Sequence, residues 1–219
     1  MGGKRASLGY SFFLLFLLGQ AAFLAGQTDL SESREISAIR RQPPDQVMDA
    51  IGVKPGMVIG EIGAGRGRYT VYLARRVGER GKVLANDISR RALSYLESRC
   101  DRLGFGNVET ILGEVEDPLF PDNALDMAIM VWVFHHLSKP DELFKNLRPS
   151  MKPGAALVIL DPPQVEIDDE FRIDRSDPAA KVLTNQEKIE RSAAASGFDL
   201  VRIETFLPRD IIFILRAKG

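Results

Sequence analysis

The chain has 219 residues, of which 45% are hydrophobic and 27% charged, a balance that fits one globular domain with a full core. A formal net charge of −1 gives no electrostatic footprint for nucleic acid, so we expect no nucleic-acid partner. Cys100 is the only cysteine, which excludes an intrachain disulfide and a cysteine-based metal site. The basic residues over 66–102 are interpreted as solvated helix faces.

The N-terminus has the layout of a secretory signal peptide, because Lys4 and Arg5 precede 23 uncharged residues, 6–28, that contain an unbroken apolar run. Its cleavage site is poor and the stretch is just long enough to span a bilayer, so an uncleaved anchor is the alternative. A buried helix is disfavoured because the stretch has no polar face. We expect residues 1–27 to be a signal peptide or membrane anchor. The domain is then exported, to the periplasm or outside the cell, or held at a membrane through residues 6–27.

A short helical arm is predicted between this leader and the first strand. Residues 29–42 are polar with two isoleucines on one face, and residues 45–51 form a second short helix. Prolines separate the two helices, and glycine and proline end the second one. We assign residues 28–56 to this arm and residues 57–219 to the main domain.

Residues 58–68, VIGEIGAGRGR, are typical of a buried strand that leads through a glycine turn into a helix. The glycines Gly63, Gly65 and Gly67 stand at alternate positions. Glycine suits such a turn because a Cβ would forbid a positive φ or hold a ligand away from the backbone. The helix N-terminus behind the turn offers unpaired N–H groups. A dinucleotide fingerprint would need its third glycine at Arg68, so a nicotinamide site is disfavoured.

The next predicted strand, residues 82–87, ends in Asp87 and completes a strand–helix–strand unit. Asp87 lies 24 residues after Gly63, near the ~20 expected of an acidic residue that accepts hydrogen bonds from ribose hydroxyls. The alternative is an N-terminal partner for the following helix, although Ser89 is available as the N-cap of that helix.

Helices and strands alternate along the rest of the chain until its last two strands. One helix is predicted over 89–103, and a second begins after Ser138 as its N-cap. A third is predicted over 184–196, where Thr184 and Glu187 form a capping box. Strands are predicted over 108–112, 125–131, 155–161, 200–206 and 211–217. A short turn joins the last two strands in an antiparallel hairpin. We therefore predict an α/β fold, a doubly wound, seven-stranded, mostly parallel sheet with an antiparallel last strand.

Over about residues 42–218 the sequence resembles the class I methyltransferases that use S-adenosylmethionine (AdoMet), and among them the small-molecule branch of ubiquinone and menaquinone C-methyltransferases. The resemblance is carried by GEIGAGRG, VLANDIS, GEVED, LDMAIMVWVFHHL, LRPSMKPG and the closing hairpin, SGF to LPRDIIFILRAK. It implies the Rossmann-like methyltransferase fold, AdoMet as the cofactor and a small-molecule acceptor.

The resemblance also implies which residues meet the cofactor. The turn Gly63, Gly65 and Gly67 would lie against the methionine part of AdoMet, with Glu61 near its ammonium. Asp87 would hold the ribose, and Glu114 with the backbone of Val115 would meet the adenine edge. Val131 and Trp132 would line the methionine and methyl end of the pocket.

Methyl transfer from a sulfonium runs in line to a lone pair, so orienting two reactants can supply roughly 7–11 kcal/mol of the barrier reduction. A base is needed only if the acceptor arrives protonated. His135 and His136, the only histidines, are the candidates, although one of an adjacent pair usually faces the core or caps a helix. Their diverging directions argue against a metal site, and none is predicted.

Two other functions stay open. AdoMet is made in the cytosol whereas the leader predicts export, so a methyltransferase-like domain that binds a ligand or partner without turnover is one alternative. A protein-residue methyltransferase is the other. Asp161 is expected at the rim of the pocket. The resemblance implies that residues 164–183 form a substrate-covering insertion.

Overall fold

The computed structural model describes residues 30–163 and 178–218. The predicted leader and most of the predicted substrate-covering insertion lie outside these residues. Among the described residues, no helix is both long and apolar enough to cross a membrane.

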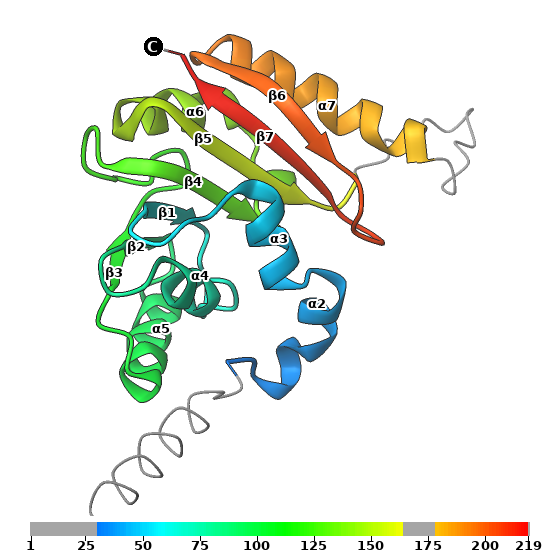
Figure 1. Ribbon diagram of the computed structural model, residues 1–219. Coiled ribbons are helices and arrows are strands. Elements are labelled where there is room, and N and C mark those ends of the chain that lie inside the picture. The colour runs from blue at the N-terminus through cyan, green and yellow to red at the C-terminus, as the bar shows by residue number, and fades with distance from the viewer. Residues whose placement is uncertain (1–29, 164–177, 219) are drawn as a thin grey trace, which may run out of the picture.

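A single seven-stranded sheet has the strand order β3-β2-β1-β4-β5-β7-β6 (Figure 1). The first five strands in sequence pair in parallel, and β7 runs antiparallel to both β5 and β6. The predicted topology and the terminal hairpin are therefore confirmed. The strands are β1 (Val58–Ile62), β2 (Lys82–Asp87), β3 (Val108–Leu112), β4 (Leu125–Val131), β5 (Met151–Asp161), β6 (Phe198–Glu204) and β7 (Ile211–Ala217).

Helices cover both faces of the sheet because alternate strand residues point to opposite sides. Ile129 of β4 packs in the core cluster that includes residues of α3 and α4, whereas Met130 packs in the cluster on the other face with α6 and α7. The helices are η1 (Ser33–Glu35), α2 (Ile36–Arg41), α3 (Pro44–Ile51), α4 (Thr70–Val77), α5 (Arg90–Leu103), η2 (Phe134–His136), α6 (Pro140–Leu147), η3 (Arg148–Ser150) and α7 (Pro178–Ala194).

Two predicted helix starts are wrong. The N-cap of α6 is Lys139 rather than Ser138, and no side chain caps that helix, whose first turn contains Pro140. Helix α7 begins at Pro178, so the predicted box at Thr184 lies inside the helix. In both helices a proline provides the start, because its fixed φ suits the first helical position and its missing N–H is not needed there.

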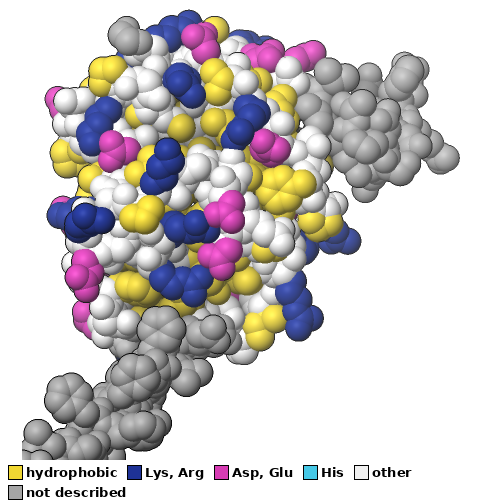
Figure 2. Space-filling view, in the orientation of Figure 1, with side chains coloured by type: hydrophobic (Ala, Val, Ile, Leu, Met, Phe, Trp, Pro, Cys, Tyr) yellow, Lys and Arg dark blue, Asp and Glu magenta, His cyan; other side chains and the backbone are white. Residues whose placement is uncertain are grey.

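The strand order reverses between β1 and β4, and a crevice for a ligand is expected at such a point, beyond the carboxyl ends of the parallel strands. Figure 1 shows η1 and α2 beside this edge of the sheet, and the turn between β6 and β7 reaches the same side. On the face drawn in Figure 2, basic and acidic side chains are interspersed. That face therefore carries no broad field of one charge.

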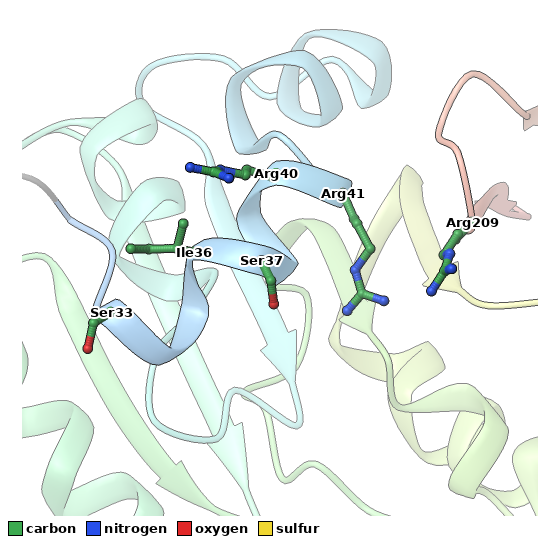
Figure 3. Close-up of a pocket in the computed structure, with 6 residues that line it drawn as sticks. All are labelled: Ser33, Ile36, Ser37, Arg40, Arg41 and Arg209. Atoms are coloured by element: carbon green, nitrogen blue, oxygen red, sulfur yellow. The ribbon is translucent and has the colours of Figure 1, made fainter.

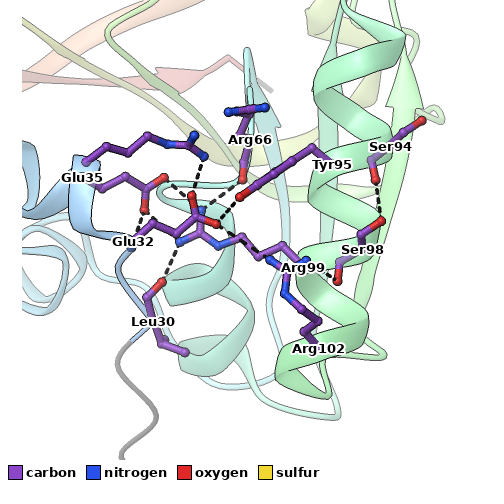
Figure 4. A network of polar contacts seen from close by, with 10 residues as sticks. Leu30, Glu32, Glu35, Arg66, Ser94, Tyr95, Ser98, Arg99 and Arg102 are labelled. Atoms are coloured by element: carbon purple, nitrogen blue, oxygen red, sulfur yellow. Dashed lines mark hydrogen bonds and ion pairs between the residues drawn. The ribbon is translucent and has the colours of Figure 1, made fainter.

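A buried ion pair fastens the arm to this edge (Figure 4). The guanidinium of Arg99, on α5, donates to both carboxylate oxygens of Glu35, at 2.9 and 2.8 Å. It also donates to the carbonyl oxygens of Leu30, at 2.6 Å, and of Arg66, at 3.1 Å. Arg66 belongs to the glycine turn. One side chain thus joins the arm, α5 and the turn, and Arg99 is 1% exposed rather than solvated as predicted.

Candidate active site

The three glycines of the turn all adopt a positive φ, of +70°, +58° and +83° in chain order. An added Cβ at Gly63 would come within 2.4 Å of Val133, and one at Gly67 within 2.3 Å of Leu96. Nothing lies within 4 Å of the corresponding position at Gly65. Glycine was expected at these positions because a ligand would approach the bare backbone. That reason applies only to Gly65, because packing against Val133 and Leu96 already excludes a side chain at Gly63 and Gly67.

The carboxylate of Asp87 holds this turn against the end of β2. One oxygen accepts a hydrogen bond from the backbone N–H of Gly65 and the other from that of Ser89, both at 2.8 Å. Ser89 in turn caps α5, where its side chain accepts from Ala92. Asp87 thus also has the alternative role, that of a hydrogen-bond partner at the start of α5. Each carboxylate oxygen retains a second lone pair, so Asp87 can also accept hydrogen bonds from ribose hydroxyls.

Glu61 lies beneath the turn and is 2% exposed. One carboxylate oxygen accepts a 2.5 Å hydrogen bond from the hydroxyl of Thr70. Burial raises the pKa of Glu61 to about 7, because the charged form loses its hydration, and the nearby charge of Arg68 opposes that shift only in part. A buried carboxyl of this kind fits a cationic group such as the ammonium of AdoMet.

Two exposed apolar side chains follow the ends of β2 and β3, which are neighbours in the sheet. Ile88 is 60% exposed and Val115 is 50% exposed. Together they can provide apolar walls for a flat ring such as adenine, while Glu114 is exposed beside them. Ile88 was not predicted as a site residue, and the available signal was a large apolar residue directly after the acidic end of the strand.

Trp132 directly follows β4 and has a φ of +60°, a conformation that is strained for a bulky side chain. Its backbone N–H donates to Leu160, at 2.9 Å, and its indole N–H donates to Asp210, at 2.7 Å. The guanidinium carbons of Arg41 and Arg68 each lie 4.8 Å from the centroid of its ring. Contacts from distant segments thus hold the strained backbone, a combination found at functional sites.

The structure distinguishes the two histidines. Nδ1 of His135 lies 2.6 Å from a carboxylate oxygen of Asp161, which ends the neighbouring strand β5. His136 is exposed, with its ring centroid 3.9 Å from that of His135. Asp161 is fully buried rather than at the rim as expected, and burial raises the pKa of its carboxyl. A carboxylate at Nδ1 orients the imidazole and leaves Nε2 free to accept a proton.

Several buried polar atoms at this edge have no hydrogen-bond partner among the described residues. They are Nε of Arg41, Nε2 of Gln42 and one oxygen each of Asp161 and Asp210. Buried polar atoms are normally paired, so these atoms near Trp132 and His135 are open to pairing with water or a bound molecule. With Glu61, Gly65 and Asp87, the described residues fit a cofactor that carries an ammonium, a ribose and a flat base.

A cavity of about 640 Å³ adjoins Trp132, between the arm and the turn that joins β6 to β7 (Figure 3). It is lined by Ser33, Ile36, Ser37, Arg40, Arg41 and Arg209. The sequence did not predict this cavity, because its walls come from opposite ends of the chain and no local pattern joins them.

Comparison with known proteins finds a family match over the central part of the chain. Residues 59–154 match a protein family described as a methyltransferase domain. This range runs from β1 into β5 and includes the glycine turn, Asp87 and His135. The match and the fold make this chain similar to the class I AdoMet-dependent methyltransferases, as the sequence resemblance implied.

The similar proteins include two ubiquinone/menaquinone biosynthesis C-methyltransferases. The one from Hydrogenovibrio crunogenus is 26% identical over 139 residues, 63% of this chain and 55% of that protein. The one from Escherichia coli O1:K1 is 30% identical over 115 residues, 52% of this chain and 46% of that protein. The chain thus spans about half the length of the curated relatives it matches.

Among solved structures, an AdoMet-dependent methyltransferase from Aquifex aeolicus superposes with a TM-score of 0.67 and 29% identity. The superposition covers 79% of this chain and 88% of that one. The similarity therefore extends beyond the matched domain to most of the described fold.

Proposed function

We propose that this chain transfers a methyl group from AdoMet to a small-molecule acceptor. The observation that carries the proposal is the meeting, at one edge of the sheet, of the glycine turn and Asp87 with the paired His135 and Asp161. The first group fits the cofactor, and the second fits a base for the acceptor. The C-methyltransferase names of the curated relatives support the reaction class without fixing the acceptor.

The cofactor residues act by binding and orientation. AdoMet, when bound, supplies a methyl group on a positively charged sulfur. Glu61 would balance the ammonium, Asp87 would accept from the ribose, and the backbone of Gly65 would approach the methionine part. Glu114 and Val115 would border the adenine, and Val131 and Trp132 the methyl end. Fixing the reactants in this way is the main contribution to rate that such a transfer requires.

His135 would remove the proton of an acceptor that arrives protonated. Asp161 holds Nδ1 of the ring, so Nε2 is the nitrogen that takes the proton. The positive charge that forms on the imidazole is then stabilised by the neighbouring carboxylate. His136 lacks such a partner among the described residues and is not assigned this role.

The first test is calorimetric titration of the purified full-length protein with AdoMet, with NADH as the parallel control. We expect micromolar AdoMet binding, about −8 kcal/mol, and no NADH binding. An acceptor screen with methyl-labelled AdoMet then follows. A folded sample that binds no AdoMet would overturn the proposal.

The predicted export of the domain favours a second function. AdoMet is made in the cytosol, so an exported domain without a supply would bind a ligand or partner and not turn over. A protein-residue methyltransferase is the alternative within the enzyme class. Labelling of a protein rather than a small molecule in the acceptor screen would favour the protein-residue methyltransferase. A folded protein that does not bind AdoMet would favour the domain without turnover.

A further inference from the structure

Guanidinium groups from opposite ends of the chain converge on the cavity beside Trp132. Figure 3 shows Arg41, at the end of α2, and Arg209, in the turn between β6 and β7, extending into the same gap. Arg40 lies on the wall of this cavity as well. Three of the six lining residues are therefore arginines, and none of the six is acidic.

These guanidiniums lack the carboxylate partners that other arginines have. Arg76 pairs with Asp49 at 2.8 Å, and Arg99 pairs with Glu35. Within the described residues, neither Arg40 nor Arg209 has an ion pair or hydrogen bond, and the buried Nε of Arg41 has no acceptor. The unpaired guanidiniums of Arg40 and Arg209 on the cavity wall therefore favour a ligand that supplies acceptor oxygens.

The cavity lies next to the methyl end of the proposed cofactor site. Arg41 stacks on the ring of Trp132, and Arg68 stacks on the same ring while donating to the side chain of Gln42 at 2.6 Å. The amide nitrogen of Gln42 is buried and unpaired. Asp210, one of the carboxylates whose charge acts on Arg68, is 2% exposed and accepts from the indole N–H. The lining of the cavity itself, with Arg40, Arg41 and Arg209 and no acidic residue, therefore carries an excess of positive charge.

We propose that this cavity binds an oxyanion, a carboxylate or phosphate group, carried by the methyl acceptor. The acceptor is then an anionic small molecule whose charged group lies close to the atom that is methylated. Arg41 and Arg209 hold the oxyanion from opposite walls, because a guanidinium can donate two parallel hydrogen bonds to such a group. The inference rests on the proposed methyl transfer for the identity of the ligand as acceptor, but the oxyanion site itself is testable alone.

Trp132 is the only tryptophan, so its fluorescence reports on this site. The full-length protein is titrated with benzoate, phenyl phosphate and the neutral benzamide, each with and without S-adenosylhomocysteine. We expect a saturable change in emission with benzoate or phenyl phosphate in both conditions, and none with benzamide. The two oxyanions compared with each other show whether a carboxylate or a phosphate is preferred. Added NaCl should weaken the binding.

Arg209→Ala is the decisive variant, because Arg209 is an exposed turn residue whose loss leaves the core intact. Its oxyanion affinity should fall by about tenfold, with Arg209→Lys between it and the wild type. Arg216→Ala is the matched control, since Arg216 is also exposed and lies on the same hairpin outside the cavity. It should stay within about twofold of the wild type, as should S-adenosylhomocysteine binding by all three variants.

The site is refuted if benzamide binds as well as benzoate, or if Arg209→Ala and Arg216→Ala bind the oxyanions equally. It is also refuted if Arg209→Ala weakens the binding of S-adenosylhomocysteine and not that of the oxyanions. That result would show that these arginines bind the carboxylate of the cofactor. A wild-type protein that binds no S-adenosylhomocysteine would count against the proposed methyl transfer, and the titrations without it would still decide whether the oxyanion site exists.

Discussion

The two halves of the sheet edge differ in charge and in how the chain builds them. On the β1–β2–β3 side, the carboxyl groups of Glu61 and Asp87 face the proposed cofactor, and both come from one strand–helix–strand unit. On the β4–β5 side, Arg41 and Arg209 face the proposed acceptor and are separated by most of the chain. In this proposal a positively charged cofactor and an anionic acceptor have separate places, so each can bind without competing for the other's groups.

The largest effect is expected on the cofactor half. Asp87→Ala removes the acceptors for the ribose and the hydrogen bond that holds Gly65. Loss of two hydrogen bonds to a charged group, at about 1.5–3 kcal/mol each, predicts AdoMet binding weaker by 100-fold or more by calorimetry. Asp122→Ala, in an exposed loop, is the control. Unchanged AdoMet affinity in Asp87→Ala would show that the ribose assignment is wrong.

The arm joins the two halves, so its anchor is the next test. Glu35→Gln leaves the buried guanidinium of Arg99 without its carboxylate, which should lower the free energy of unfolding by about 3–5 kcal/mol in urea. The exposed pair of Lys82 and Glu109 is the comparison, where Lys82→Gln should cost about 1 kcal/mol at most. Equal effects in the two variants would show that the arm is not fastened through Arg99.

On the acceptor half, substitution of the two histidines should have different effects on kcat. His135→Ala should lower kcat by about 10²–10⁴-fold for an acceptor that must lose a proton, whereas His136→Ala should have little effect. The kcat of Asp161→Asn should lie between those of the two histidine variants, because asparagine keeps the shape of the pair but lacks the charge that stabilises the imidazolium. Steady-state assays with the acceptor found in the screen check this. Full turnover in both histidine variants would exclude either as the base.

The smallest effect is a pH dependence at Glu61. Its pKa is raised from 4.5 to about 7, so its contribution to the stability of the ligand-free protein is fully present below pH 4.5 and is lost as the pH rises through 7. AdoMet affinity should move the opposite way, falling about tenfold per pH unit below 7, because the ammonium favours the carboxylate.

Urea unfolding and calorimetry across this pH range measure the two slopes. Glu61→Gln should remove both, whereas Glu79→Gln, at an exposed position, should keep them. If affinity in the wild type does not depend on pH between 5 and 8, Glu61 does not face the ammonium.

The division between the cofactor half and the acceptor half also explains which parts of the site could be predicted from the sequence. The glycine turn and Asp87 lie within one strand–helix–strand unit, and the hydrophobic periodicity and turn residues predicted the seven strands along the chain and the terminal hairpin. The pairing of His135 with Asp161 depends on β4 lying beside β5, and the cavity depends on how the arm docks. No local pattern contains that information. A basic residue such as Arg99 looks like a solvated helix position until its buried partner, 64 residues away, is seen.

The ion pair between Glu35 and Arg99 also limits how this protein can diverge. Either residue changed alone leaves a buried charge, so the first substitution would be removed by selection before the second could arise. Descendants of this chain should therefore keep both residues or have exchanged both together. The arm would then be inherited with α5 as one unit, even though the glycine turn lies between them in the sequence.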